Sequence, residues 1–170
     1  MHDTEEEKIE RLMKRIEAND PVAMRHMGAE KYHKGDYKAA FEYWTMAAEM
    51  GDTLAHHNLS VMYQHGEGVK KDVKREVHHA EHAAIGGQPS SRCNLGCVEW
   101  KNGRVDRAAK HFIIAAKHGD DLSLGNVKNL YKAGVVSKDD FAAALRGHQA
   151  AIAATKSPQR EEAVEFYNNR

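Results

Sequence analysis

The sequence predicts an all-α fold, a solenoid of helix-turn-helix repeats, and three observations support this prediction. Paired alanines followed by a glycine recur, in AAEMGD at 47–52, AAIGGQ at 83–88 and AAKHGD at 115–120. Between these stretches an apolar residue, an aromatic and a glycine three residues after the aromatic also recur. Only 3 of the 170 residues are proline, so prolines interrupt few of the predicted helices. Recurrence at a near-constant period is typical of repeat architectures.

The recurring residues divide the chain into four repeats, each of two helices. The first helix ends at the glycine after the aromatic, because glycine adopts the left-handed backbone that ends a helix. The second helix ends in paired alanines, which let neighbouring helices approach closely. An aspartate at the start of three repeats can cap the helix that follows. The predicted repeats span 20–51, 52–87, 88–119 and 120–156, and the predicted helices within them span 21–34, 36–50, 52–65, 72–86, 89–102, 104–118, 120–133 and 137–155.

Both ends of the chain are predicted to form capping helices. A helix at about 4–18, within residues 1–19, places four apolar side chains on one face: Ile9, Leu12, Met13 and Ile16. A helix at about 158–168, within residues 157–170, begins with the helix-start signal Ser157-Pro158. An open stack of repeats needs such covers to stay in solution. The sequence thus predicts one solenoid domain over residues 1–170.

Two of the repeats, 20–51 and 88–119, resemble tetratricopeptide units. In the first of them the signature positions hold Met27, Gly28, Tyr32, Gly35, Ala40, Trp44 and Ala47. In the second the same positions hold Leu95, Gly96, Trp100, Gly103, Ala108, Phe112 and Ala115. The repeat 120–156 keeps fewer of these residues.

The repeat 52–87 is longer and resembles the Sel-one-like repeat family. The turn between its helices has the form Gly-x-Gly-Val, and the repeat closes with Ala-Ala-x-x-Gly. The matching residues are Ala55, Leu59, Tyr63, Gly66, Gly68, Val69, Asp72, Ala83, Ala84 and Gly87. It departs from that family at Glu76 and His79, where a small residue and an aromatic are preferred. The chain is therefore similar to the Sel-one-like repeat family, with tetratricopeptide-like units interleaved.

The resemblance implies a right-handed superhelix in which the first helices of the repeats line a concave groove. It also implies which positions face the groove: two before, two after and six after the apolar residue of each repeat. The candidate groove residues are Arg25, Ala29, His33, His57, Val61, Cys93, Cys97, Lys101 and Asn129. By analogy with this fold we expect the groove to bind an extended peptide or a helix of a partner protein. The predicted function is thus that of a non-enzymatic scaffold or adaptor.

Composition and motifs exclude several other classes of function. Lysine and arginine number 25, as do aspartate and glutamate, so no excess positive charge is present to hold nucleic acid. No apolar run approaches the length of a membrane span, and the acidic start differs from a secretory signal. We expect a cytoplasmic protein, with the nucleus as the alternative. Phosphate-loop, His-Glu-x-x-His and Gly-x-Ser-x-Gly motifs are absent from the sequence, and we expect no cofactor.

Histidine and cysteine support an alternative function in metal binding or redox chemistry. The chain has 12 histidines, and His78 and His82 are spaced as two zinc ligands on a helix would be, although a third ligand is required. Cys93 and Cys97 stand one helical turn apart, and Arg92 could lower a thiol pKa there. The simpler interpretation is that the histidines lie on the surface or in packing contacts, and that the cysteines are small packing residues.

Two further features have structural and functional interpretations. The run from Lys70 to Arg75 is basic and could contact an acidic partner or phosphate, or it could be a solvated helix start with Asp72 as its cap. Four large aromatics are expected to pack between helices: Phe41, Trp44, Trp100 and Phe112.

Overall fold

The computed structural model describes residues 4–155, and these residues form nine helices and no strand. The helices are α1 (Glu5–Glu17), α2 (Pro21–His33), α3 (Tyr37–Glu49), α4 (Thr53–His65), α5 (Val73–Ile85), α6 (Pro89–Lys101), α7 (Val105–Lys117), α8 (Asp121–Lys132) and α9 (Lys138–Thr155). Every predicted helix in this range is confirmed, with both ends within one residue. The predicted capping helix at 158–168 lies outside the described residues.

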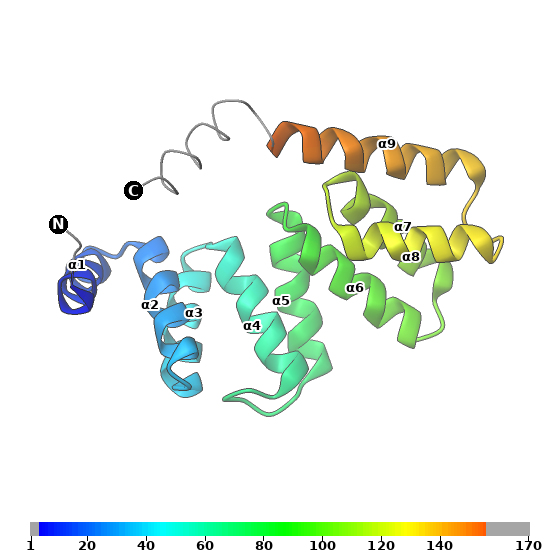
Figure 1. The fold of residues 1–170 in the computed structure, drawn as a ribbon. Coiled ribbons are helices and arrows are strands. Elements are labelled where there is room, and N and C mark those ends of the chain that lie inside the picture. Colours follow the sequence, from blue (N-terminus) through cyan, green and yellow to red (C-terminus); the bar gives the residue numbers. More distant parts are fainter. Residues whose placement is uncertain (1–3, 156–170) are drawn as a thin grey trace. The chain divides into compact units, whose positions relative to one another are not determined.

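The chain divides into two compact units, the first ending at Ser91 and the second beginning at Arg92. In the first unit each helix packs against the next along the chain, from α1 to α5 (Figure 1). In the second unit α7 packs against both α8 and α9, and these two pack against each other. The helix pairs α2/α3 and α4/α5 are the predicted repeats 20–51 and 52–87. The extent of the predicted single domain stays a prediction.

Aspartates cap the helices at three of the predicted repeat boundaries. The Asp20 carboxylate accepts from the backbone N–H of Val22 at 2.9 Å. Asp52 accepts from Ala55 at 2.8 Å, and Asp120 accepts from Ser123 at 2.7 Å. The preceding glycines at 51 and 119 have φ of +85° and +91°, a backbone that strongly favours glycine. The predicted sequence of helix end, turn and helix start is confirmed at these boundaries.

The four alanine pairs differ in burial. The pairs at 47–48, 83–84 and 115–116 are buried, as their role in close helix packing requires. The fourth pair, at 150–151, differs, because Ala150 is exposed and Ala151 is half-buried. On α9 the buried side chains are Ala144 and His148 instead. The alanine-pair prediction is therefore wrong for the last repeat.

Two helical glycines provide space for large aromatic rings. A Cβ at Gly28 of α2 would lie 2.4 Å from the Trp44 ring of α3. A Cβ at Gly96 of α6 would lie 2.6 Å from the Phe112 ring of α7. Trp44 and Phe112 are almost fully buried, as predicted. Each apolar-glycine pair in the tetratricopeptide pattern thus brings a first helix into contact with an aromatic of the second.

The first helix covers the start of the stack, as predicted. Thr4 and Glu7 form a reciprocal capping box at its N-terminus. The apolar side chains at 9, 12 and 16 are half-buried, and α1 packs against α2. Met13 is 40% exposed, so its predicted place on the buried face is wrong. Neighbouring residues of an α-helix point about 100° apart, and Met13 therefore points away from the half-buried Leu12. Within residues 4–155 no helix combines the length and apolar character needed to cross a membrane.

Candidate functional site

In the first unit, two predicted groove residues already bond to other side chains. The Nε of Arg25, on α2, donates to Asp52 at 3.1 Å, and the Arg25 side chain is only 21% exposed. His57, on α4, bonds through Nδ1 to the Ser91 hydroxyl at 2.7 Å, and burial lowers the pKa of its imidazole. Arg25 thus joins α2 to the cap of α4, and His57 joins α4 to the start of α6. Both side chains stabilise the stack before any ligand binds.

None of the other predicted groove residues of the first unit forms such a side-chain bond with another residue of the range 4–155. His33, at the end of α2, is exposed. Ala29 on the same helix and Val61 on α4 are half-buried. These three side chains offer a small, largely apolar surface with one imidazole.

In the second unit, three predicted groove residues line one pocket. The pocket has a volume of about 260 Å³ and is formed by α6, α7 and α8. Its lining residues are Cys97, Trp100, Lys101, Phe112, Asn126, Asn129 and Leu130. Phe112 and Leu130 are buried and form its apolar part, while Lys101 and Asn129 are exposed. Cys93, one turn before Cys97, is buried in the core, so its predicted exposure to a groove is wrong.

The predicted burial of Trp100, which lines this pocket, is wrong. Trp100 was expected to pack between helices like Trp44, but half of its surface is exposed, against 4% for Trp44. At the matching position of the previous repeat, Tyr63 is also 4% exposed. After Tyr63 an extended turn leads to α5, where the Arg75 guanidinium donates to the Tyr63 hydroxyl. The turn after Trp100 is shorter. Tyr32 is followed by a turn as short as that after Trp100 and is half-buried, so turn length gave no sequence signal for the exposure of Trp100.

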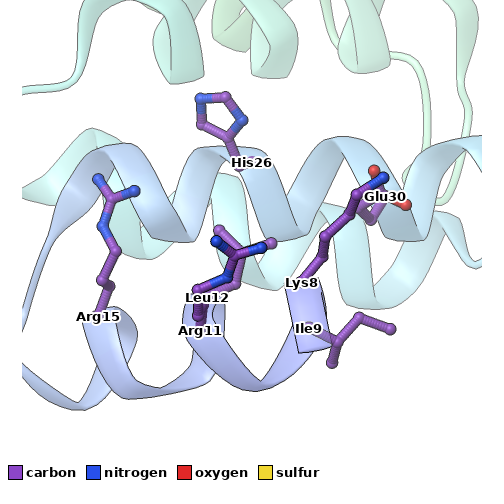
Figure 2. Close-up of a pocket in the computed structure, with 7 residues that line it drawn as sticks. All are labelled: Lys8, Ile9, Arg11, Leu12, Arg15, His26 and Glu30. Carbon is purple, nitrogen blue, oxygen red and sulfur yellow. The ribbon is translucent and has the colours of Figure 1, made fainter. Parts of the chain in front are cut away.

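A pocket of about 330 Å³ lies between α1 and α2 (Figure 2). Its lining residues are Lys8, Ile9, Arg11, Leu12, Arg15, His26 and Glu30. Arg15 donates to Asp20 at 2.8 Å, and Figure 2 shows the Lys8 side chain pointing toward Glu30. Arg15 is held by Asp20, and Lys8 and Arg11 also interact with other groups, so the cations of this pocket are already engaged. It is the seam where the capping helix meets the first repeat.

Comparison with known families identifies the repeats. The Sel1 repeat model matches residues 21–52, 53–81 and 101–120. Three segments of this chain match the Sel1 repeat. The match at 21–52 extends the Sel1 signature to a repeat with the tetratricopeptide pattern, and the match at 101–120 covers the second helix of repeat 88–119.

Two solved structures have a similar fold. One is c5321, a protective antigen present in uropathogenic Escherichia coli strains that displays an SLR fold, with a TM-score of 0.69 and 28% identity. The similarity covers 87% of this chain and 33% of c5321. The other is a Sel1 repeat protein from Oxalobacter formigenes, with a TM-score of 0.70 and 20% identity over 85% of this chain and 65% of that protein. These similarities confirm the predicted all-α repeat solenoid.

Curated relatives are longer than this chain. DAP3-binding cell death enhancer 1 of Mus musculus is 23% identical over 96% of this chain and 40% of its own length, and the Rattus norvegicus protein gives the same values. The chain thus spans about two fifths of the length of these relatives. The ERAD-associated E3 ubiquitin-protein ligase component HRD3B of Arabidopsis thaliana is 51% identical over 41 residues, which are 24% of this chain and 7% of that protein.

The cysteine pair of the repeat 88–119 forms no disulfide, and the surroundings of Cys93 favour its protonated thiol. A hydrogen bond with Cys97 and burial raise the pKa of the Cys93 thiol well above its usual value. The expectation that Arg92 would lower this pKa is therefore wrong for Cys93, because the neighbouring sulfur and burial outweigh it.

Four histidines of the repeat 52–87 cluster between α4 and α5. The Nδ1 atoms of His56 and His79 share a hydrogen bond of 2.9 Å. The rings of His56 and His82 stack at 4.7 Å, and His78 meets His82 edge-on at 4.7 Å. His79 stacks on Tyr63 with an angle of 9° between the ring planes. The imidazole of His79 thus takes the place of the aromatic that the Sel1 pattern prefers at this position.

The cluster does not form a metal site in the described part of the chain. Among residues 4–155 no three side chains of His, Cys, Asp or Glu are arranged to hold a metal ion. His78 and His82, the predicted candidate ligands, have each other and further histidines as ring neighbours. The histidines act in this structure as packing groups.

The histidine cluster predicts that acid destabilises the fold. Burial, followed by the neighbouring His56, His78, His82 and Arg75, lowers the pKa of His79 from 6.5 to about 4. His79 therefore takes up a proton near pH 6.5 in the unfolded chain but only near pH 4 in the folded chain. The contribution of His79 to the free energy of unfolding is complete above pH 6.5 and is lost as the pH falls from 6.5 to 4. Because His79 is half-buried, we expect a loss of about 1–2 kcal/mol across this window.

This pH dependence can be measured by urea unfolding between pH 7.5 and 4. The variant His79→Phe keeps a ring stacked on Tyr63 but cannot take up the proton, so the slope between pH 6.5 and 4 should decrease. An unchanged slope in this variant would show that other groups cause the acid sensitivity.

Proposed function

We propose that the protein is a non-enzymatic adaptor that binds an extended segment of a partner protein in the pocket of α6, α7 and α8. Sel1 repeat proteins generally mediate protein–protein interaction. One relative is named for binding DAP3, and another is a component of a ubiquitin ligase. These names describe association with other proteins, and the proposal extends such association to this chain.

The observation behind the proposal is that Cys97, Lys101 and Asn129 meet around one apolar pocket beside a half-exposed Trp100. Exposed tryptophan beside a pocket is typical of the residues that dominate protein interfaces. Phe112 and Leu130 can receive an apolar side chain of the partner. The Asn126 and Asn129 amides can bond to the backbone of an extended segment, because each amide both donates and accepts.

In the first unit, His33, Ala29 and Val61 are a second, weaker candidate surface. Arg25 and His57 contribute there by holding α2, α4 and the start of α6 together, because their polar groups already have partners. A substitution at Arg25 would therefore change stability along with any binding.

Selection from a library of random extended peptides, followed by fluorescence anisotropy with the selected peptides, tests the proposal. Trp100→Ala should weaken binding about tenfold or more, because an interface tryptophan contributes well over 1 kcal/mol. Leu122→Ala is the matched control, since Leu122 is 75% exposed on α8 but does not line the pocket. Equal binding by Trp100→Ala, or a library that yields no binder, would contradict the proposal.

A further inference from the structure

A pocket in the first unit joins aromatic side chains to the basic run of the extended turn. Its volume is about 380 Å³, and α3, α4, the turn and the start of α5 form it. The lining residues are Phe41, Tyr63, Val69, Lys70, Lys71, Asp72 and Arg75. The pocket of α6, α7 and α8 shares none of these residues.

The turn that holds Lys70 and Lys71 is fixed at several points. The Tyr32 hydroxyl donates to the Glu67 carboxylate at 2.5 Å, which ties the turn to α2 and raises the pKa of Tyr32 to about 12. Gly68 has a φ of +70°, and a Cβ there would lie 2.8 Å from Tyr37, so the turn lies directly on the start of α3. Val69 packs against the core of the unit. The two lysines therefore project from a supported backbone.

The acidic groups near the pocket already have partners. Asp72 accepts from the backbone N–H groups of Lys74 and Arg75, at 3.0 and 3.1 Å, as the cap of α5. Glu67 holds the Tyr32 hydroxyl, and it does not line the pocket. The pocket is thus lined by three cations, Lys70, Lys71 and Arg75, and by one carboxylate, Asp72, which caps α5 and also lies 3.7 Å from the Arg75 guanidinium.

The aromatic wall of the pocket is ordered by contacts of its own. The rings of Phe41 and Tyr63 meet edge to face, with centroids 5.8 Å apart. The Arg75 guanidinium donates to the Tyr63 hydroxyl at 3.0 Å and lies 5.6 Å from the ring centroid. Arg75 is thereby held at the edge of the pocket with donors to spare, since a guanidinium has five N–H groups.

We propose that this pocket binds an acidic segment of a partner protein that carries one apolar side chain among its carboxylates. The apolar side chain would lie on Phe41 and Val69, and the carboxylates would pair with Lys70, Lys71 and Arg75. A ligand with phosphate alone would leave the aromatic wall uncovered. A nucleic acid requires a run of cations longer than three, and the chain has no net charge to extend it.

An array of synthetic dodecapeptides tests the proposal, with fluorescence anisotropy as the readout. Each peptide has one apolar residue, Phe, Tyr, Trp, Leu, Ile or Met, among glutamates and aspartates. We expect binding that weakens as salt increases, and that is lost when the apolar residue becomes serine or the acids become amides. The double variant Lys70→Gln/Lys71→Gln should bind at least tenfold more weakly.

Lys74→Gln is the control, because it removes one positive charge close to the two lysines, at the second residue of α5, which does not line the pocket. It should change binding less than twofold. Failure of every peptide to bind, equal loss in Lys74→Gln, or equal affinity for the serine peptide or for inorganic phosphate would overturn the proposal. Trp100→Ala should keep this binding, which separates the site from the pocket of α6, α7 and α8.

Discussion

Replacing Trp44 with alanine is expected to lower the free energy of unfolding by about 3–5 kcal/mol. The Trp44 ring is 4% exposed and lies directly on Gly28, which has no side chain to fill the space that the ring leaves. Its Nε1 also donates to the Arg25 carbonyl at 3.1 Å, and this acceptor would lose its donor. The loss should appear as a lower midpoint of urea unfolding, followed by far-UV circular dichroism.

Trp100→Ala provides the matched control, because it removes the same side chain from a half-exposed position. This substitution should lower the free energy of unfolding by less than about 1 kcal/mol, since removal of a half-exposed ring leaves no closed cavity. Similar losses in the two variants would contradict the assignment of Trp44 to the core and of Trp100 to a binding surface.

The helices and their turns could be predicted because the local signals agree with one another. Glycine, aspartate and the alanine pair each specify a different part of a helix boundary, and at Gly51 and Asp52 all three coincide. Such consistency between local preference and fold is what lets sequence specify structure. The last repeat lacks this agreement, and there the alanine pair at 150–151 does not mark the buried face.

The candidate sites could be predicted only in part, because burial and pairing depend on residues far apart in the sequence. Three residues selected by position counting, Cys97, Lys101 and Asn129, line one pocket, and their role in binding stays a prediction. The same counting placed Arg25 in a groove, although Asp52, 27 residues away, holds it in an ion pair. The basic run at 70–75 was visible in the sequence, but the aromatic wall beside it requires Phe41 of the previous repeat.

The ion pair between α2 and α4 leads to the second large expected effect, in Asp52→Ala. One Asp52 oxygen accepts from Ala55 N–H at 2.8 Å, and the other accepts from Arg25 at 3.1 Å, with the Asp52 side chain only 9% exposed. The substitution removes a helix cap and leaves the Arg25 guanidinium largely buried without a counter-charge. We expect the free energy of unfolding to fall by about 2–4 kcal/mol.

Asp36→Ala separates the two contributions. Asp36 also caps a helix, through Ala39 N–H at 3.1 Å, but it is exposed and forms no ion pair with the other residues that the structure describes. Its loss should cost about 1 kcal/mol. Asp52→Asn should lower the free energy of unfolding by an amount between those of Asp52→Ala and Asp36→Ala. Its amide oxygen can still accept from Ala55 but carries no charge to pair with Arg25. Urea unfolding of the three variants measures the order, and equal costs for Asp52→Ala and Asp36→Ala would mean that the ion pair adds nothing to the cap. A clear difference would show that this pair, rather than the turn alone, couples neighbouring Sel1 repeats.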